Sequence, residues 1–83
     1  MVTIMITLPI QGGDIDAVRA DLLRDFVFET LDPVERDAAA AKLCLRSNDD
    51  VGARYHLKRV VEHVKAAAVT FRELEALTGG RAA

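Results

Sequence analysis

Apolar or small side chains recur at alternating steps of three and four through residues 51–78. This spacing is the period of one face of an α-helix, and it holds for three heptads. We therefore predict a long helix over residues 50–78, whose apolar face forms the protein core or a dimer interface. The side chains of this predicted stripe are Leu57, Val60, Val64, Ala67, Phe71 and Leu74.

The sequence around Thr70 could interrupt this helix. Thr70 and Glu73 have the spacing of a capping box, and a helix over residues 50–78 would span about 42 Å, more than the roughly 30 Å width of a globule of this size. The apolar stripe nevertheless passes through Phe71 without losing phase. Continuity is the favoured reading, with a break near Thr70 as the alternative.

Two shorter helices are predicted before the long one. Residues 14–31 have an apolar stripe at helical spacing, and Asp32 and Pro33 then provide a frequent N-cap and a favoured first helical residue for a second helix over residues 33–46. Gly79 and Gly80 end the last helix and leave residues 79–83 as a tail. The expected core residues are Ile15, Val18, Leu22 and Phe26, flanked by Leu23 and Val27, in the first helix, and Val34, Ala38, Ala41 and Leu45 in the second.

The start of the chain has the alternation of a β-strand. Val2, Ile4, Ile6 and Leu8 fall on one face, so we predict a strand within residues 1–10. No second stretch has this pattern, and a single strand must satisfy its backbone groups elsewhere. It pairs with its twin in a dimer, adds to a sheet of another protein, or lies extended on the helices. The predicted fold is mostly α: one N-terminal strand, then three helices, in a small bundle completed by dimerisation.

Length and composition narrow the class of protein. The chain has 83 residues, 51% hydrophobic and 29% charged, which is the composition of one small globular domain with a thin stability margin. A homodimer is expected for this reason. No apolar run approaches the ~20 residues of a membrane span, and the apolar start lacks the basic region of a signal peptide. A single cysteine allows no internal disulfide and suits a cytoplasmic location, and abundant arginine and alanine suggest a bacterial or phage source.

Side chains for catalysis or metal binding are few. Ser47 is the only serine, and it falls where a helix cap is needed. His56 and His63 are seven residues apart, two helical turns from one another, with no further ligand at metal-binding spacing. Cys44 is most simply a small buried hydrophobic residue. We predict no enzyme activity, no cofactor and no metal site.

Charge is divided along the chain. Residues 14–37 carry eight acidic and three basic side chains, whereas residues 51–72 carry five basic and one acidic side chain. The favoured interpretation is that the acidic segment lies against the basic one, within a chain or across a dimer. The alternative is a basic strip that binds phosphate or an acidic partner.

The element order resembles the DNA-binding ribbon-helix-helix dimers, in which a strand precedes two helices. Here the outward strand residues would be Thr3, Met5 and Thr7, which do not read base edges, and the second helix would begin with acidic residues. A helix-turn-helix with its turn at residues 68–70 is another template. A dimeric DNA-binding regulator or antitoxin is therefore the alternative function.

The favoured function is a small non-catalytic regulator, inhibitor or adaptor that binds another protein through a helical surface. Tyrosine and arginine are enriched at the centres of protein interfaces, which selects side chains beside the main stripes. Phe28 is either a core contact or a partner contact. The candidate contact residues are Phe28, Tyr55, His56, Arg59, His63 and Arg72.

Overall fold

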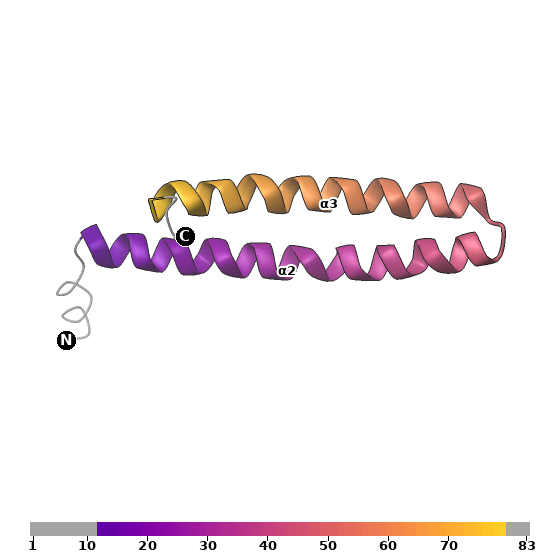
Figure 1. The fold of residues 1–83 in the computed structure, drawn as a ribbon. Coiled ribbons are helices and arrows are strands. Elements are labelled where there is room, and N and C mark those ends of the chain that lie inside the picture. Colours follow the sequence, from indigo (N-terminus) through magenta and orange to yellow (C-terminus); the bar gives the residue numbers. More distant parts are fainter. Residues whose placement is uncertain (1–11, 80–83) are drawn as a thin grey trace.

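The protein folds as a helical hairpin in the computed structural model, which describes residues 12–79 (Figure 1). Helix α2 spans Gly12–Arg46 and helix α3 spans Asp50–Leu77. The two helices run antiparallel and are joined by a short turn at one end (Figure 1). At the open end, α2 projects past the end of α3.

The predicted architecture of one strand and three helices is therefore wrong. The predicted strand falls outside the described residues, and residues 12–79 contain two helices and no strand. The predicted helices over 14–31 and 33–46 are parts of one continuous helix, with Pro33 inside it. Helix α3 is continuous through Thr70.

The side chains that face α3 explain why Pro33 does not end α2. A proline inside a helix lacks an N–H donor and crowds the preceding turn, at a cost of about 3 kcal/mol. The buried or half-buried residues Val27, Thr30, Val34 and Asp37 keep steps of three and four across this point. A continuous helix therefore keeps α2 in contact with α3 on both sides of Pro33, and this contact offsets the local loss at Pro33.

The turn is fixed by hydrogen bonds at both helix ends. Asn48 has a φ of 61°. The Asp49 N–H donates to the Cys44 carbonyl at 2.7 Å, and the Asn48 N–H donates to the Leu45 carbonyl at 3.1 Å, which is the Schellman pattern of a helix C-terminus. The Asp49 side chain then accepts a hydrogen bond from the Gly52 N–H at 2.9 Å and caps α3. Asp49 therefore takes the capping role in the structure, rather than Ser47, which the sequence also places where a cap is needed.

The contact between the helices, here called the seam, follows one line of positions on each helix at steps of three and four. This is the spacing of an antiparallel coiled coil. The seam residues are Ala20, Leu23, Val27, Thr30, Val34, Asp37, Ala41 and Cys44 of α2, and Ala53, His56, Val60, His63, Ala67, Thr70, Leu74 and Leu77 of α3. Among the described residues, the buried apolar ones are four alanines and Leu74, so the seam is a thin core.

The helices meet along lines other than the most apolar ones. Within the predicted stripe, Val60, Ala67 and Leu74 lie in the seam, whereas Leu57, Val64 and Phe71 lie beside it and are 44–49% exposed. The positions they would have filled are taken by His56, His63 and Thr70.

The same shift occurs on α2. Leu23 and Val27 lie in the seam, as do Val34 and Ala41. The other predicted core residues of this helix are exposed: Ile15, Val18, Leu22, Phe26, Ala38 and Leu45. The period of the predicted pattern is therefore confirmed, but the contact face includes positions next to the predicted ones.

Candidate functional site

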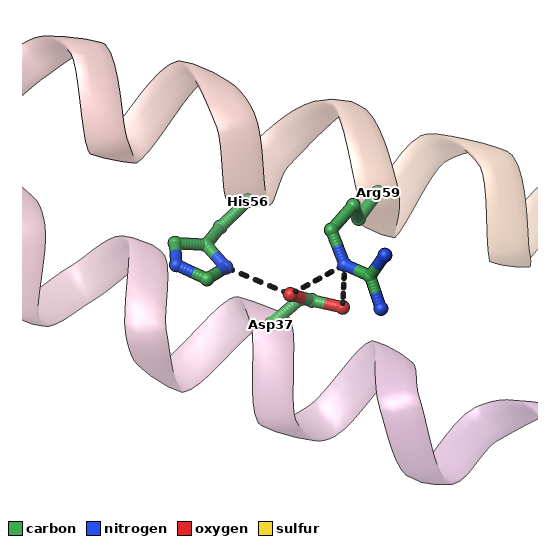
Figure 2. A network of polar contacts seen from close by, with 3 residues as sticks. All are labelled: Asp37, His56 and Arg59. Carbon is green, nitrogen blue, oxygen red and sulfur yellow. Dashed lines mark hydrogen bonds and ion pairs between the residues drawn. The ribbon is translucent and has the colours of Figure 1, made fainter.

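Asp37 is a buried charged residue in the part of the seam nearer the turn. Its side chain is 9% exposed. The His56 Nδ1 atom lies 2.8 Å from Asp37 Oδ1, and the Arg59 Nε–H donates to both carboxylate oxygens at 3.1 Å (Figure 2). Because His56 and Arg59 are three residues apart on α3, they project from adjacent turns and reach the same carboxylate.

The pKa values of this cluster reflect the pairing. The hydrogen bond from His56, followed by the hydrogen bond and charge of Arg59, lowers the pKa of Asp37 against the opposing effect of burial. The Asp37 carboxylate in turn raises the pKa of Arg59. A buried charge is stabilised only while its partners are in place. The cluster therefore opposes sliding of one helix along the other and fixes the register of the hairpin.

Tyr55 extends the cluster to the surface. Its ring meets the His56 ring edge to face, with centroids 5.1 Å apart, and the Arg59 guanidinium carbon lies 5.8 Å from the centroid of the Tyr55 ring. A shallow hollow beside them is lined by Tyr55, Lys58, Arg59, Glu62 and His63. We call Tyr55, His56, Arg59 and His63 the tyrosine patch.

Four of the six predicted contact residues therefore lie together in the tyrosine patch. Phe28 lies elsewhere, on α2, where it is 72% exposed, and it is not a core contact of the hairpin. Arg72 is exposed on α3 and does not line the hollow. Asp37, which orders His56 and Arg59, was not predicted. The available signal was its spacing of three from Val34 and four from Ala41, but the neighbouring Ala38 offered an apolar alternative on the same turn.

A second feature is an uncovered apolar surface along one side of the hairpin. One hollow joins Leu45 of α2 to Leu57 and Val61 of α3, and another joins Phe28 and Leu31 of α2 to Phe71 of α3. These hollows place the exposed side chains of both helices on the same side. We call this side the apolar face; its large residues, 41–72% exposed, are Phe28, Leu31, Leu45, Leu57, Val61, Val64 and Phe71.

A further apolar stripe belongs to α2 alone. Ile15, Val18, Leu22 and Phe26 are 49–64% exposed. Their helical positions differ from those of Phe28 and Leu31, so this stripe is separate from the apolar face. It lies in the part of α2 nearest the open end.

The ion pairs between the helices are few among the described residues. Apart from the Asp37 cluster, Arg19 of α2 pairs with Glu73 of α3 at 3.1 Å, with both side chains at least half exposed. Within residues 15–79, an acidic group of α2 meets basic groups of α3 only at Asp37. The other charged side chains within residues 16–36 and 51–72 are exposed.

Cys44 lies in the seam close to Gly52 of α3. It is half-buried, and desolvation, followed by the nearby Asp49 carboxylate, raises the pKa of its thiol. The thiol therefore stays protonated at neutral pH and is a poor nucleophile. This agrees with its interpretation as a small hydrophobic residue.

The described residues do not assemble a group of three or more histidine, cysteine, aspartate or glutamate side chains that could hold a metal ion. Neither of the helices in the described part of the chain combines the length and apolar character needed to cross a bilayer. Comparisons of the chain with protein-family models, with curated proteins and with solved structures found no match.

Proposed function

We propose that the chain is a small non-catalytic protein-binding module, acting as a regulator, inhibitor or adaptor through a helical surface. The observation that carries this proposal is the imbalance between exposed and buried apolar side chains. In residues 15–79, the seam buries one large apolar residue, Leu74, while large apolar side chains on both sides of the hairpin are about half exposed. Exposed apolar surface on this scale is typical of protein interaction sites.

The tyrosine patch is the proposed contact surface for another protein. Tyrosine and arginine dominate the energetics of many interfaces. Asp37 holds Arg59 and His56 in place, and Arg59 in turn lies over Tyr55. Side chains that are ordered before binding lose less conformational entropy on association, which supports this patch over the unrestrained charges elsewhere.

A homodimer is the second part of the proposal. Two helices cover each other on one side only, and domains this small are often completed by oligomerisation. The single cysteine supports a cytoplasmic location, and the arginine- and alanine-rich composition supports a bacterial or phage source.

Affinity capture on the immobilised full chain from cells of the source, with mass spectrometry, tests the partner-binding proposal. A double variant, Tyr55→Ala with Arg59→Ala, should weaken binding of the captured partner at least about tenfold, as expected for truncated hot spots. The matched control is Asp25→Ala with Asp32→Ala, two exposed residues on α2. Equal binding by both variants and the native chain would show that the tyrosine patch is not the contact surface.

DNA binding is the second candidate. The observation that favours it is an exposed basic row at intervals of seven on α3: Lys58, Lys65 and Arg72. The helices of both DNA-binding templates differ from the described fold, because no helix begins at Pro33 and α3 has no turn at residues 68–70. Duplex affinity that weakens by ~10³ between 50 and 200 mM salt would support contact with about six phosphates, and no affinity at 50 mM would remove this candidate.

A further inference from the structure

We infer that the apolar face is covered by the apolar face of a second copy of this chain, laid antiparallel so that the two turns lie at opposite ends of a four-helix bundle. This inference rests on the homodimer proposed above and adds its interface and orientation. In this arrangement α3 packs on the partner's α3, and α2 packs on the partner's α2.

The sequence of α3 along the apolar face is symmetric about Val64. The positions on this side of α3 are Arg54, Leu57, Val61, Val64, Ala68, Phe71 and Glu75. Laid antiparallel on itself, the row sets Leu57 against Phe71, Val61 against Ala68, and Val64 against its own copy. Each of these pairs joins two apolar side chains, and Arg54 meets Glu75 at both ends of the row.

The sequence of α2 along the same face has its own symmetry. The central positions are Arg24, Phe28, Leu31 and Glu35. An antiparallel copy sets Phe28 against Leu31 and Arg24 against Glu35. Arg24 otherwise pairs with Asp21 on its own helix at 3.0 Å, an exposed contact that contributes little and exchanges readily.

The two centres of symmetry lie at the same level of the hairpin. The Asp37–His56 contact places Val64 level with residue 29, and the Arg19–Glu73 contact places it level with residue 28. Both levels lie within two residues of the midpoint between Phe28 and Leu31. One twofold axis can therefore pass through both centres of symmetry. An isologous dimer requires such an axis, whereas the folding of a single hairpin does not require this symmetry in its sequence.

Charge at the ends of α2 suits this orientation. The last turns of α2 carry Lys42 and Arg46, whereas its first turns carry Asp16 and Asp21. With α2 on the partner's α2 and the turns at opposite ends, the basic end of one helix lies over the acidic end of the other. These contacts select the antiparallel orientation more than they add affinity.

The size of the apolar face is adequate for a dimer. A half-exposed aromatic side chain still presents about 100 Å², and the seven large side chains together present roughly 600 Å² per copy. A standard-size interface takes about 800 Å² from each partner, and the flanking charged residues supply the remainder.

The rival orientation places α3 over the partner's α2, with both turns at the same end. It brings the basic row of α3 beside Asp25 and Asp32, but it also sets Glu35 against Leu57 within the apolar face. A carboxylate in an apolar contact costs more than like charges repelling across a solvated rim. The apolar register therefore favours the antiparallel arrangement.

Site-directed crosslinking of the full chain tests this inference together with a mass measurement. In a Cys44→Ser background, Val64→Cys places two thiols at the twofold axis, where a short thiol crosslinker joins them. Val69→Cys is the matched control, because Val69 is 60% exposed and points away from the apolar face. Light scattering at about 10 μM chain gives the mass, and circular dichroism confirms that each variant is helical.

We expect a dimer mass, crosslinking of most Val64→Cys chains, and at least about tenfold less crosslinking of Val69→Cys, because crosslinking requires close approach of the two residues. A dimer mass with no crosslink at Val64, or with equal crosslinking at Val69, would overturn the interface while the homodimer stands. A monomer mass would overturn both the homodimer and this interface, and would mean that something other than a second copy covers the apolar face.

Discussion

Asp37 and His56 meet at 2.8 Å across the seam, on helices joined only through a turn at one end. The contact fixes which turn of α2 lies beside which turn of α3. The thin apolar seam on either side, mostly alanine, does not define this register by shape alone. A buried polar group that specifies register is a known device of coiled coils.

The Asp37 cluster predicts a dependence of stability on acid. The folded state lowers the pKa of Asp37, mainly through the hydrogen bond from His56, whereas the unfolded carboxyl has a pKa of about 3.9. The stabilisation is therefore fully present above about pH 5 and is lost as the pH falls through the unfolded and then the folded pKa. Thermal unfolding midpoints between pH 6 and pH 3 should fall more steeply for the native chain than for Asp37→Asn. Asp25→Asn, at an exposed position, should follow the native chain; parallel curves for Asp37→Asn would contradict the pairing.

Gly52→Ala should destabilise the protein, although this change usually stabilises a helix by about 1 kcal/mol. A Cβ atom at this position would lie 2.9 Å from both the Cys44 Sγ and the Asp49 Cγ atoms, so the cap and the seam would have to shift. We expect a loss of about 1–3 kcal/mol in the free energy of unfolding, measured by chemical denaturation at one fixed chain concentration. Adding Cys44→Ala should recover part of the loss. A gain in stability for Gly52→Ala alone would show that the helices do not approach this closely at the turn.

Asn48 occupies the left-handed region of φ, which glycine adopts without strain. Asn48→Gly should therefore leave stability unchanged or raise it by up to about 1 kcal/mol, whereas Asn48→Ala should lower it by about 1 kcal/mol. Ser47→Ala is the control, because the Ser47 hydroxyl makes one exposed hydrogen bond to the Leu43 carbonyl. Chemical denaturation of the three variants separates the effect of backbone conformation at Asn48 from the effect of losing a polar side chain in the turn. Equal stability of the glycine and alanine variants would contradict this turn geometry.

Pro33→Ala tests the continuity of α2. Inside an unbroken helix the change restores a backbone donor and removes a steric conflict, so the free energy of unfolding should rise by about 1–3 kcal/mol. Ala39→Pro, at an exposed position of the same helix, should lower it by about 3 kcal/mol. If Pro33→Ala instead lowered stability, proline would be acting as the first residue of a separate helix.

Much of the secondary structure followed from the sequence because steps of three and four persist along both helices. The extent of α3 and the continuity of its pattern through Phe71 were readable in this way. At Pro33, the local cap and proline signals predict a helix boundary, whereas the steps of three and four from Val27 to Ala41 predict one continuous helix. The contact with α3, which no local signal describes, decides that position.

The identity of the contact face was harder to predict. Sequence reasoning selects the most apolar line of each helix, but the hairpin meets along the adjacent line, which includes His56, His63 and Thr70. Both lines are apolar enough to pack, and a pair of helices uses only one. Because the contact face was not predicted, the residues of the tyrosine patch were predicted singly and not as a cluster. Asp37, the α2 residue that holds His56 and Arg59 in place, was not predicted.

The turn also sets the order in which the hairpin closes. Facing residues are separated by 19 positions at the Asp37–His56 contact and by 54 at the Arg19–Glu73 contact, and the entropy of loop closure rises with separation. Each contact formed near Asn48 shortens the free loop before the next one. The molecule should therefore zip from Asn48 outward and fray from the open end, with amide protons near Cys44 exchanging last and those beside Arg19 first.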